Sequence, residues 1–238
     1  MIGLIYTLLT GLFFLIGICL NKILKNKKNI NVLAVSLSFV VLVNLICFDI
    51  IPEISENFNF KSFLVVVLGL AVLKIFDLFV PHHHHNHKDK HDNVKEHNEH
   101  LEHISIVSIL SLTLHNIIEC MALYTIANAN NQAGLLMACG IALHNIPLGF
   151  QIGGSLNNNS KTYTVILTLS GFVGGVICMF LGTLSHAVET YILCFTLGML
   201  IYLTIFELLK EIYSTRKNIY VYYGIIIGIT IVMISGLL

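Results

Sequence analysis

Two short segments share a core of four residues, LHNI: LTLHNIIEC at 112–120 and IALHNIPLG at 141–149. Each lies inside an apolar stretch that is long enough, at about 20 residues, to cross the hydrocarbon core of a bilayer as a helix. The LHNI cores place His115 and His144 close to the middle of their stretches. An ionisable residue at that depth costs about 2.5–3.5 kcal/mol on insertion scales. The two segments therefore predict a functional site inside a membrane.

The composition of the whole chain agrees with a membrane protein. Its 238 residues are 56% hydrophobic and only 11% charged, whereas soluble domains carry roughly 25% charged residues. We expect an all-α polytopic fold in a single transmembrane domain, 1–238, and we interpret its first apolar run as a spanning helix and not as a cleaved signal peptide. The apolar stretches predict eight spanning helices, at about 2–20, 32–51, 62–80, 104–127, 132–155, 163–185, 189–209 and 219–237.

The basic residues predict the orientation. Of the 13 Lys and Arg residues, all but Lys61 and Lys74 fall in the odd-numbered connections, and such residues concentrate in cytoplasmic loops. Both termini are then extracellular or lumenal, in a plasma or organelle membrane. The third connection, 81–103, is a polar cytoplasmic loop with nine histidines. It is typical of a flexible metal-collecting segment, and a merely solvated or regulatory loop is the alternative.

A second pair of similar segments predicts an internal repeat. FDIIPEI (48–54) ends the second predicted helix, and FELLKEI (206–212) ends the seventh. The two helices run in opposite directions, so the match indicates inverted three-helix repeats around a central helix pair. Transporters of this design bind substrate at the repeat interface. Asp49 and Glu207 are candidate entry and exit ligands, and ordinary interfacial carboxylates are the alternative.

The midplane residues have the chemistry of a metal site. His115 and Glu119 are four residues apart and share one helical face, with Asn116 about 100° away from His115 around the helix. The fifth helix adds His144 and Asn145. Imidazole nitrogens with carboxylate and amide oxygens suit zinc or ferrous iron, and the donors do not decide between them. Interhelical hydrogen bonding is the alternative role.

Small residues and a proline mark the fifth helix. Pro147 removes a backbone donor, a break that is tolerated beside a cavity or a neighbouring helix. Four small residues predict a close approach of neighbouring helices: Gly140, Gly149, Gly153 and Gly154.

With its eight spans, outside termini, His-rich cytoplasmic loop and paired HN motifs, the chain resembles the ZIP (Zrt/Irt-like) family of divalent metal transporters. FDIIPE (48–53) and DLFVPHHH (77–84) look like that family's second-span motif and third-span ending. The resemblance implies that zinc or iron moves into the cytoplasm as transported substrate, by an elevator-like or rocking motion and often in a homodimer. It also implies roles for seven residues: a main site of His115, Glu119 and His144, flanking ligands Asn116 and Asn145, an entrance residue Asp49 and an exit residue Glu207.

The chain departs from the pattern of that family at several positions. HNxPEG reads HNIIEC at 115–120, and the Glu expected in the fifth helix is Leu148. In SGFVGG (170–175), Gly174 replaces another Glu, and Phe206 replaces a His before Glu207. Because two carboxylates of a two-metal centre are missing, we predict a single-metal site.

Three other functions were weighed. A cation-diffusion exporter has six spans and a large soluble C-terminal domain, which does not match this pattern. A membrane metalloenzyme would need motifs such as HExxH, and neither this motif nor a cofactor-binding or nucleic-acid-binding pattern occurs in the sequence. A metal sensor that binds metal without moving it remains the alternative to transport.

Overall fold

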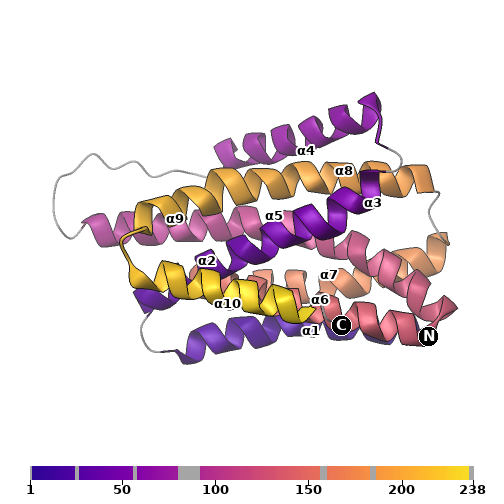
Figure 1. The fold of residues 1–238 in the computed structure, drawn as a ribbon, viewed down its shortest axis with the longest axis horizontal. Helices are drawn as coiled ribbons and strands as arrows, with labels where there is room; N and C mark the ends of the chain where they lie inside the picture. Colours follow the sequence, from indigo (N-terminus) through magenta and orange to yellow (C-terminus); the bar gives the residue numbers. More distant parts are fainter. Residues whose placement is uncertain are drawn as a thin grey trace.

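The computed structural model describes residues 2–24, 27–55, 58–79, 92–155, 160–182 and 186–235. These residues form helices and turns, with no strand in the ranges given (Figure 1). Each of the eight predicted spans corresponds to one continuous helix, and two of these contain a π-helical segment. The elements are α1 (Ile2–Ile23), α2 (Lys27–Asn44), η1 (Leu45–Ile50), α3 (Ile51–Ser55), α4 (Phe60–Phe79), α5 (Asp92–Ala129), α6 (Asn131–Ser155), α7 (Ser160–Leu181), α8 (His186–Tyr202), η2 (Leu203–Leu208), α9 (Leu209–Thr215) and α10 (Ile219–Ser235).

The helices have the length and composition of membrane spans. Six segments of the described chain are both long enough and apolar enough to span a membrane. The apolar part of α10, Ile219–Ile234, is shorter than these. Together with α4, whose apolar side chains face outward, these helices form an all-α polytopic membrane protein. The six segments are Ile2–Ile23, Asn29–Ser55, Ser108–Ala129, Asn131–Gly153, Lys161–Leu181 and Thr190–Thr215.

The helix α5 extends beyond its predicted span. It begins at Asp92 and has 38 residues, so the second part of the predicted loop 81–103 is helical, and residues 80–91 lie outside the described structure. Polarity keeps the segment 92–103 out of the bilayer, but it does not prevent a helix from continuing into water.

The packing of the helices has the symmetry of an inverted repeat. α1 packs along α6 and α7 along α5, while α4 packs along α8 and α10 along α2. The repeat relates the first three spans to the last three, and α5 to α6. Under this exchange the α1–α6 pair becomes the α7–α5 pair, and the α4–α8 pair becomes the α10–α2 pair. The second and seventh spans run in opposite directions (Figure 1), as the repeat predicted.

Two π-helical segments mark the same point in both repeats. η1 and η2 each have six residues, and each contains the Phe-acid pair of its repeat motif, Phe48–Asp49 in one and Phe206–Glu207 in the other. A π turn holds an additional residue and occurs frequently at functional sites. The sequence match between these segments therefore extends to an unusual backbone geometry.

The predicted close contacts of the fifth span are partly confirmed. A Cβ on Gly149 or Gly153 would collide with backbone atoms of α1, so these glycines allow α1 and α6 to touch. Gly140 was predicted wrongly, because nothing lies within 4 Å of its Cβ position, and the surroundings of Gly154 are outside what the structure describes. Pro147 stands inside a continuous α6.

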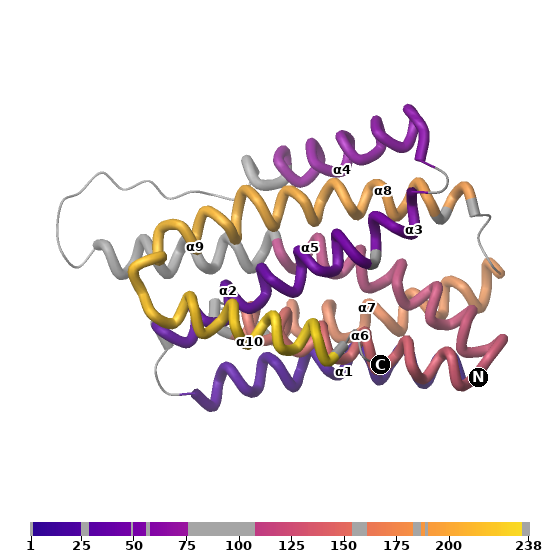
Figure 2. The backbone as a smooth tube through the Cα atoms, viewed as in Figure 1, coloured from indigo at the N-terminus to yellow at the C-terminus, as the bar shows by residue number. Residues whose placement is uncertain are grey.

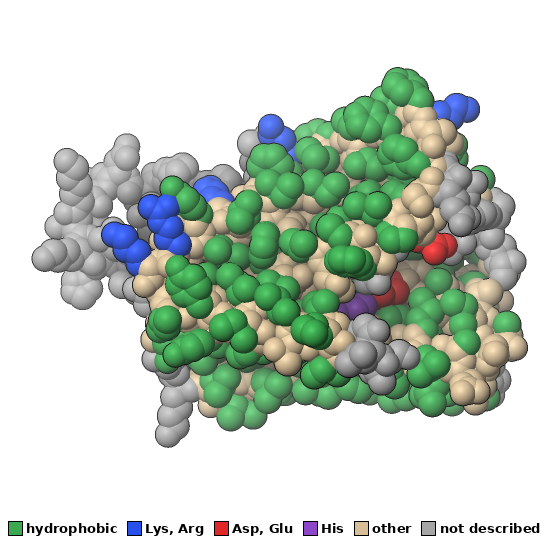
Figure 3. Space-filling model, viewed as in Figure 1, with side chains coloured by type: hydrophobic (Ala, Val, Ile, Leu, Met, Phe, Trp, Pro, Cys, Tyr) green, Lys and Arg blue, Asp and Glu red, His purple; other side chains and the backbone are tan. Residues whose placement is uncertain are grey.

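The basic residues gather at one end of the bundle. In Figure 3, most of the Lys and Arg side chains on the face shown lie at the left, around α9. α1 begins and α10 ends toward the opposite end (Figure 2), as an even number of crossings requires. The arrangement has the charge asymmetry on which the predicted orientation rests.

Candidate metal centre

Three of the predicted ligands converge at one point between α5 and α6. The Glu119 Oε2 atom lies 3.5 Å from His115 Nε2 and 3.3 Å from His144 Nε2. One ligand atom from each residue lies within 4.8 Å of the others, and the two imidazole rings are 6.3 Å apart with a tilt of 46°. His115 and Glu119 meet because they are one helical turn apart on α5. His144 meets them from α6, which packs against α5.

The spacing of these atoms fits a single ion. Zn²⁺ binds His nitrogen and carboxylate oxygen at about 2.0–2.2 Å, and tetrahedral geometry then separates two ligand atoms by roughly 3.3 Å. Both carboxylate–imidazole distances are close to this value. The three side chains leave a fourth tetrahedral position for water or another donor, as in an open metal site. The site can therefore hold and release an ion without a closed cage.

The centre is buried, but it opens into a hollow. The side chain of His115 is 6% exposed, that of Glu119 13% and that of His144 14%. His115 Nε2 is buried and, beyond its 3.5 Å contact with Glu119 Oε2, has no hydrogen-bond partner among the described residues, a costly state for a polar group that a bound cation would relieve. A histidine and an acidic side chain are visible in a hollow in Figure 3. Since His115 and His144 are the histidines whose side chains are described, this histidine belongs to the centre.

The two asparagines of the HN motifs contact neighbouring helices. Asn116 Nδ2 donates a hydrogen bond to Ser170 Oγ in α7 at 2.7 Å. Asn145 Nδ2 donates to the backbone carbonyl of Thr10 in α1 at 3.0 Å. Both asparagines are 1% exposed. The predicted interhelical role is thus observed for their amide nitrogens, and their role as metal ligands stays a prediction.

The predicted entry and exit residues belong to the two π-helical segments. Asp49 lies in η1, but its side chain is outside the described part of the chain. Glu207 lies in η2 and is 6% exposed, and it is not part of the three-residue cluster. Their roles stay predictions. The side chains of the histidines in 81–103, and those of His186 and Glu189, are also outside the described structure.

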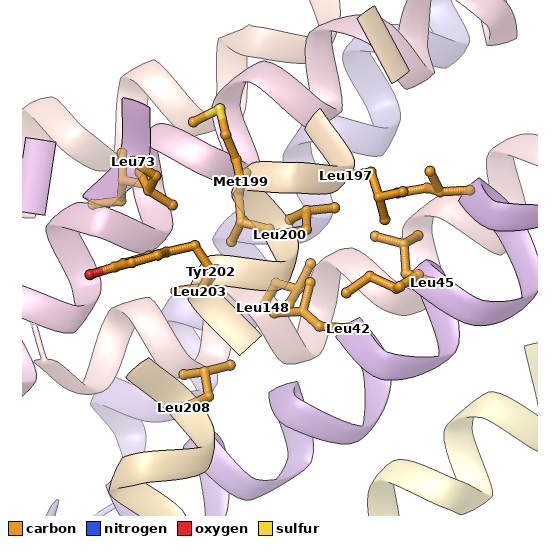
Figure 4. Packing of buried hydrophobic residues seen from close by; sticks show 14 of the residues in the cluster. Leu42, Leu45, Leu73, Leu148, Leu197, Met199, Leu200, Tyr202, Leu203 and Leu208 are labelled. Carbon is orange, nitrogen blue, oxygen red and sulfur yellow. The ribbon is translucent and has the colours of Figure 1, made fainter. Parts of the chain in front are cut away.

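Leu148 replaces a carboxylate with a tightly packed apolar side chain. It is fully buried in a cluster that includes Leu42 of α2 and Leu45 of η1. Figure 4 shows Leu148 beside these residues and close to Leu200 and Leu203 of the seventh span. The position is part of the contact between α6 and both repeats, so in this chain it contributes apolar packing and no metal ligand.

Gly174 and Phe206 occupy the other changed positions. A Cβ on Gly174 would overlap the carbonyl oxygen of Ile117, so α5 and α7 are too close for any side chain at that point. Phe206 is 50% exposed and stacks on Tyr202 with the ring centres 5.1 Å apart. Gly174 therefore serves the contact between α5 and α7, whereas Phe206 makes its ring contact within its own span.

The sequence did not reveal Ser170, whose hydroxyl group accepts from Asn116, or Thr10, whose backbone carbonyl accepts from Asn145 and whose hydroxyl group contacts Cys120. Thr10 and Ser170 lie in apolar spans, where a buried hydroxyl group needs a partner. That requirement was the available signal, but nothing in the sequence indicated which span would supply the partner.

The family model of the ZIP zinc transporter matches residues 79–236. The chain belongs to the ZIP family. The matched region contains α5 and α6 with all three ligands of the centre, and also the second repeat. A search of curated proteins finds no match. Membership of the ZIP family makes metal-ion transport across a membrane the general function of the chain.

Proposed function

We propose that the chain carries a divalent transition-metal ion, zinc or ferrous iron, through the bilayer by way of His115, Glu119 and His144. The observation that carries the proposal is the meeting of these three side chains in the middle of two spanning helices, with Glu119 Oε2 3.3 and 3.5 Å from the two imidazole nitrogens and all three ligand atoms within 4.8 Å of one another. Nitrogen and oxygen donors with an open fourth position favour zinc or ferrous iron over alkali ions. The ion is the transported substrate.

The direction of transport that we propose is into the cytoplasm. The family resemblance implies it, and the basic end of the bundle (Figure 3) supports the orientation with cytoplasmic odd-numbered connections. Accessibility of single cysteines, placed in the connection 215–219 and at the start of α1, would locate each end. Labelling of the first site from outside intact cells would contradict the orientation.

The test of the function is metal uptake by proteoliposomes. Wild type, His115→Ala and Glu119→Ala would be compared with Zn²⁺ and Fe²⁺ in parallel. Gly140→Ala serves as the control, because it changes α6 where nothing lies within 4 Å. We expect uptake by wild type and the control, and no uptake by the two ligand variants although they remain folded. The ratio of the two rates identifies the preferred metal.

A metal sensor is the second candidate, and Leu148 is the observation that favours it. Because Leu148 packs in the apolar core where the family pattern has a Glu, an ion that leaves the centre has one fewer carboxylate to which it can move next. A sensor would bind zinc with a dependence on His115 but would show no uptake. Uptake that is unchanged in both ligand variants would contradict the central site in either function.

A further inference from the structure

Each of the three ligands is followed in the sequence by a residue of a buried hydrogen-bonded network. Asn116 follows His115, Cys120 follows Glu119 and Asn145 follows His144. Neighbouring residues on a helix point about 100° apart, so these three side chains lie beside the centre on the sides of α5 and α6 that face other helices. The inference below rests on the proposed function.

One part of the network joins α5 to α7. Asn116 Nδ2 donates to Ser170 Oγ at 2.7 Å, and Ser170 Oγ donates to the carbonyl of Leu167 at 2.7 Å. The Ser170 hydroxyl group therefore uses its proton within α7 and accepts from α5. Asn116 and Ser170 are 1% and 2% exposed, so water does not compete for these bonds, and the side-chain orientation of Asn116 is fixed.

The other part joins α5 and α6 to α1. Thr10 supplies two atoms: its carbonyl accepts from Asn145 Nδ2 at 3.0 Å, and its Oγ1 lies 3.5 Å from Cys120 Sγ. Cys120 Sγ in turn lies 3.7 Å from Asn116 Oδ1. Thr10 Oγ1 also donates to the carbonyl of Thr7. A continuous set of contacts thus runs from α6 through α1 to α5 and on to α7.

We propose that Asn116, Cys120 and Asn145 are positioning residues of the metal centre, which hold the three ligands in register through Thr10 and Ser170 and do not themselves bind the ion. The Thr10 carbonyl can only accept, so Asn145 must turn its NH₂ group toward α1. Asn116 Oδ1 faces Cys120. Outer groups that orient ligands in this way typically contribute 10- to 100-fold to metal affinity. The ion is then held by His115, Glu119 and His144.

The first arm of the test is a double-mutant cycle on zinc affinity. Zn²⁺ would be titrated into the purified full chain, as wild type, Asn116→Ala, Ser170→Ala and the double variant. A positioning role predicts that each single variant loses roughly 10- to 100-fold in zinc affinity. The double variant should lose no more than the single variant with the larger loss, because both substitutions remove the same hydrogen bond. Ser36→Ala is the matched control: Ser36 is also buried, but it bonds only within its own helix, to Val32.

The second arm uses Asn145 and does not depend on the folding of the Ser170 variant. Asn145→Asp keeps an oxygen that could bind zinc but loses the NH₂ group that Thr10 accepts from. A positioning role predicts that Asn145→Asp loses as much affinity as Asn145→Ala. X-ray absorption of bound zinc should show the same two imidazole ligands in every variant that binds.

Four results would overturn the proposal. Additive losses at Asn116 and Ser170, or an Asn145→Asp variant that binds zinc as tightly as wild type, would make the asparagines ligands. A lower melting temperature of the metal-free protein with unchanged zinc affinity would give the network a packing role alone. Zinc binding that is unaffected by His115→Ala would remove the centre itself, and with it both this inference and the proposed function.

Discussion

A close contact between α5 and α7, at Gly174 and Ile117, gives a sharp prediction for Gly174→Ala. The added Cβ would lie 2.9 Å from the carbonyl carbon of Ile117 and 3.1 Å from its Cα, besides overlapping the carbonyl oxygen. Ordinary van der Waals contact begins at 3.4 Å, so relief of the overlap with the carbonyl oxygen requires α5 to move by roughly 1 Å, as overpacked cores do. Ile117 lies between His115 and Glu119, and the movement therefore reaches two of the three ligands.

The expected size of the effect follows from this displacement. Overpacking costs about 1–3 kcal/mol of stability. Functional groups tolerate errors of about 0.5 Å, and a 1 Å misplacement costs about 100-fold. We therefore expect zinc uptake into proteoliposomes to fall about 100-fold, together with a lower melting temperature in detergent.

Gly140→Ala is the control for this experiment, since it adds the same methyl group to a spanning helix. Nothing lies within 4 Å of its Cβ position, and alanine is favoured over glycine in helices by about 0.8–1.0 kcal/mol. This variant should keep both stability and uptake. Equal uptake by Gly174→Ala and Gly140→Ala would refute the argument that contact between α5 and α7 fixes the centre.

Three more predictions concern stability. Leu148→Ala should cost about 2–3 kcal/mol of stability, the low end for buried leucines, because lipid chains are as apolar as leucine. Leu136→Ala, at a residue that is 48% exposed, should cost much less. Equal losses of the two variants in denaturant unfolding would argue against the packing in Figure 4. Ser38→Ala removes the 2.9 Å hydrogen bond from Ser38 Oγ to the Pro147 carbonyl and should cost about 0.6 kcal/mol, the average for such bonds in membranes; no change in unfolding would mean that the carbonyl finds another donor. Zinc at a hundredfold excess over its Kd should stabilise wild type by about 2.7 kcal/mol and His144→Ala by far less, as thermal melting would show, whereas equal stabilisation would place the ion elsewhere.

The sequence predicted the parts of the structure that depend on periodicity and on local spacing. The eight apolar runs became helices because each must satisfy its own backbone groups in a bilayer. His115 and Glu119 were paired correctly because a separation of four residues fixes their geometry on any helix. The match of FDIIPEI with FELLKEI indicated the repeat because both segments carry the same pattern at the same place in a span.

What the sequence did not predict depends on contacts between distant helices. Neither Thr10 nor Ser170 could be assigned to an asparagine, because the depth and rotation of α1 and α7 relative to α5 are set by packing. Gly174 was interpreted as a lost carboxylate, and the overlap with Ile117 shows that it is also the residue that allows α5 and α7 to touch. The beginning of α5 at Asp92 was missed because polar residues indicate where the chain leaves the bilayer, and a helix can continue beyond that point into water.

The paired π-helical segments bear on how such a chain can arise. Five spans precede the second three-helix unit, an odd number, so a copy of the first unit enters the membrane from the opposite side without any change to its own sequence. The wide turn, with its additional residue, stands at the same place in both units. Duplication of an ancestral unit that already contained this turn would provide one carboxylate-bearing wide turn for each side of the bilayer, Asp49 for one and Glu207 for the other. A gene duplication that places the second copy after an odd number of spans is thus sufficient to provide a carboxylate-bearing wide turn for each side of the bilayer from a unit that has one.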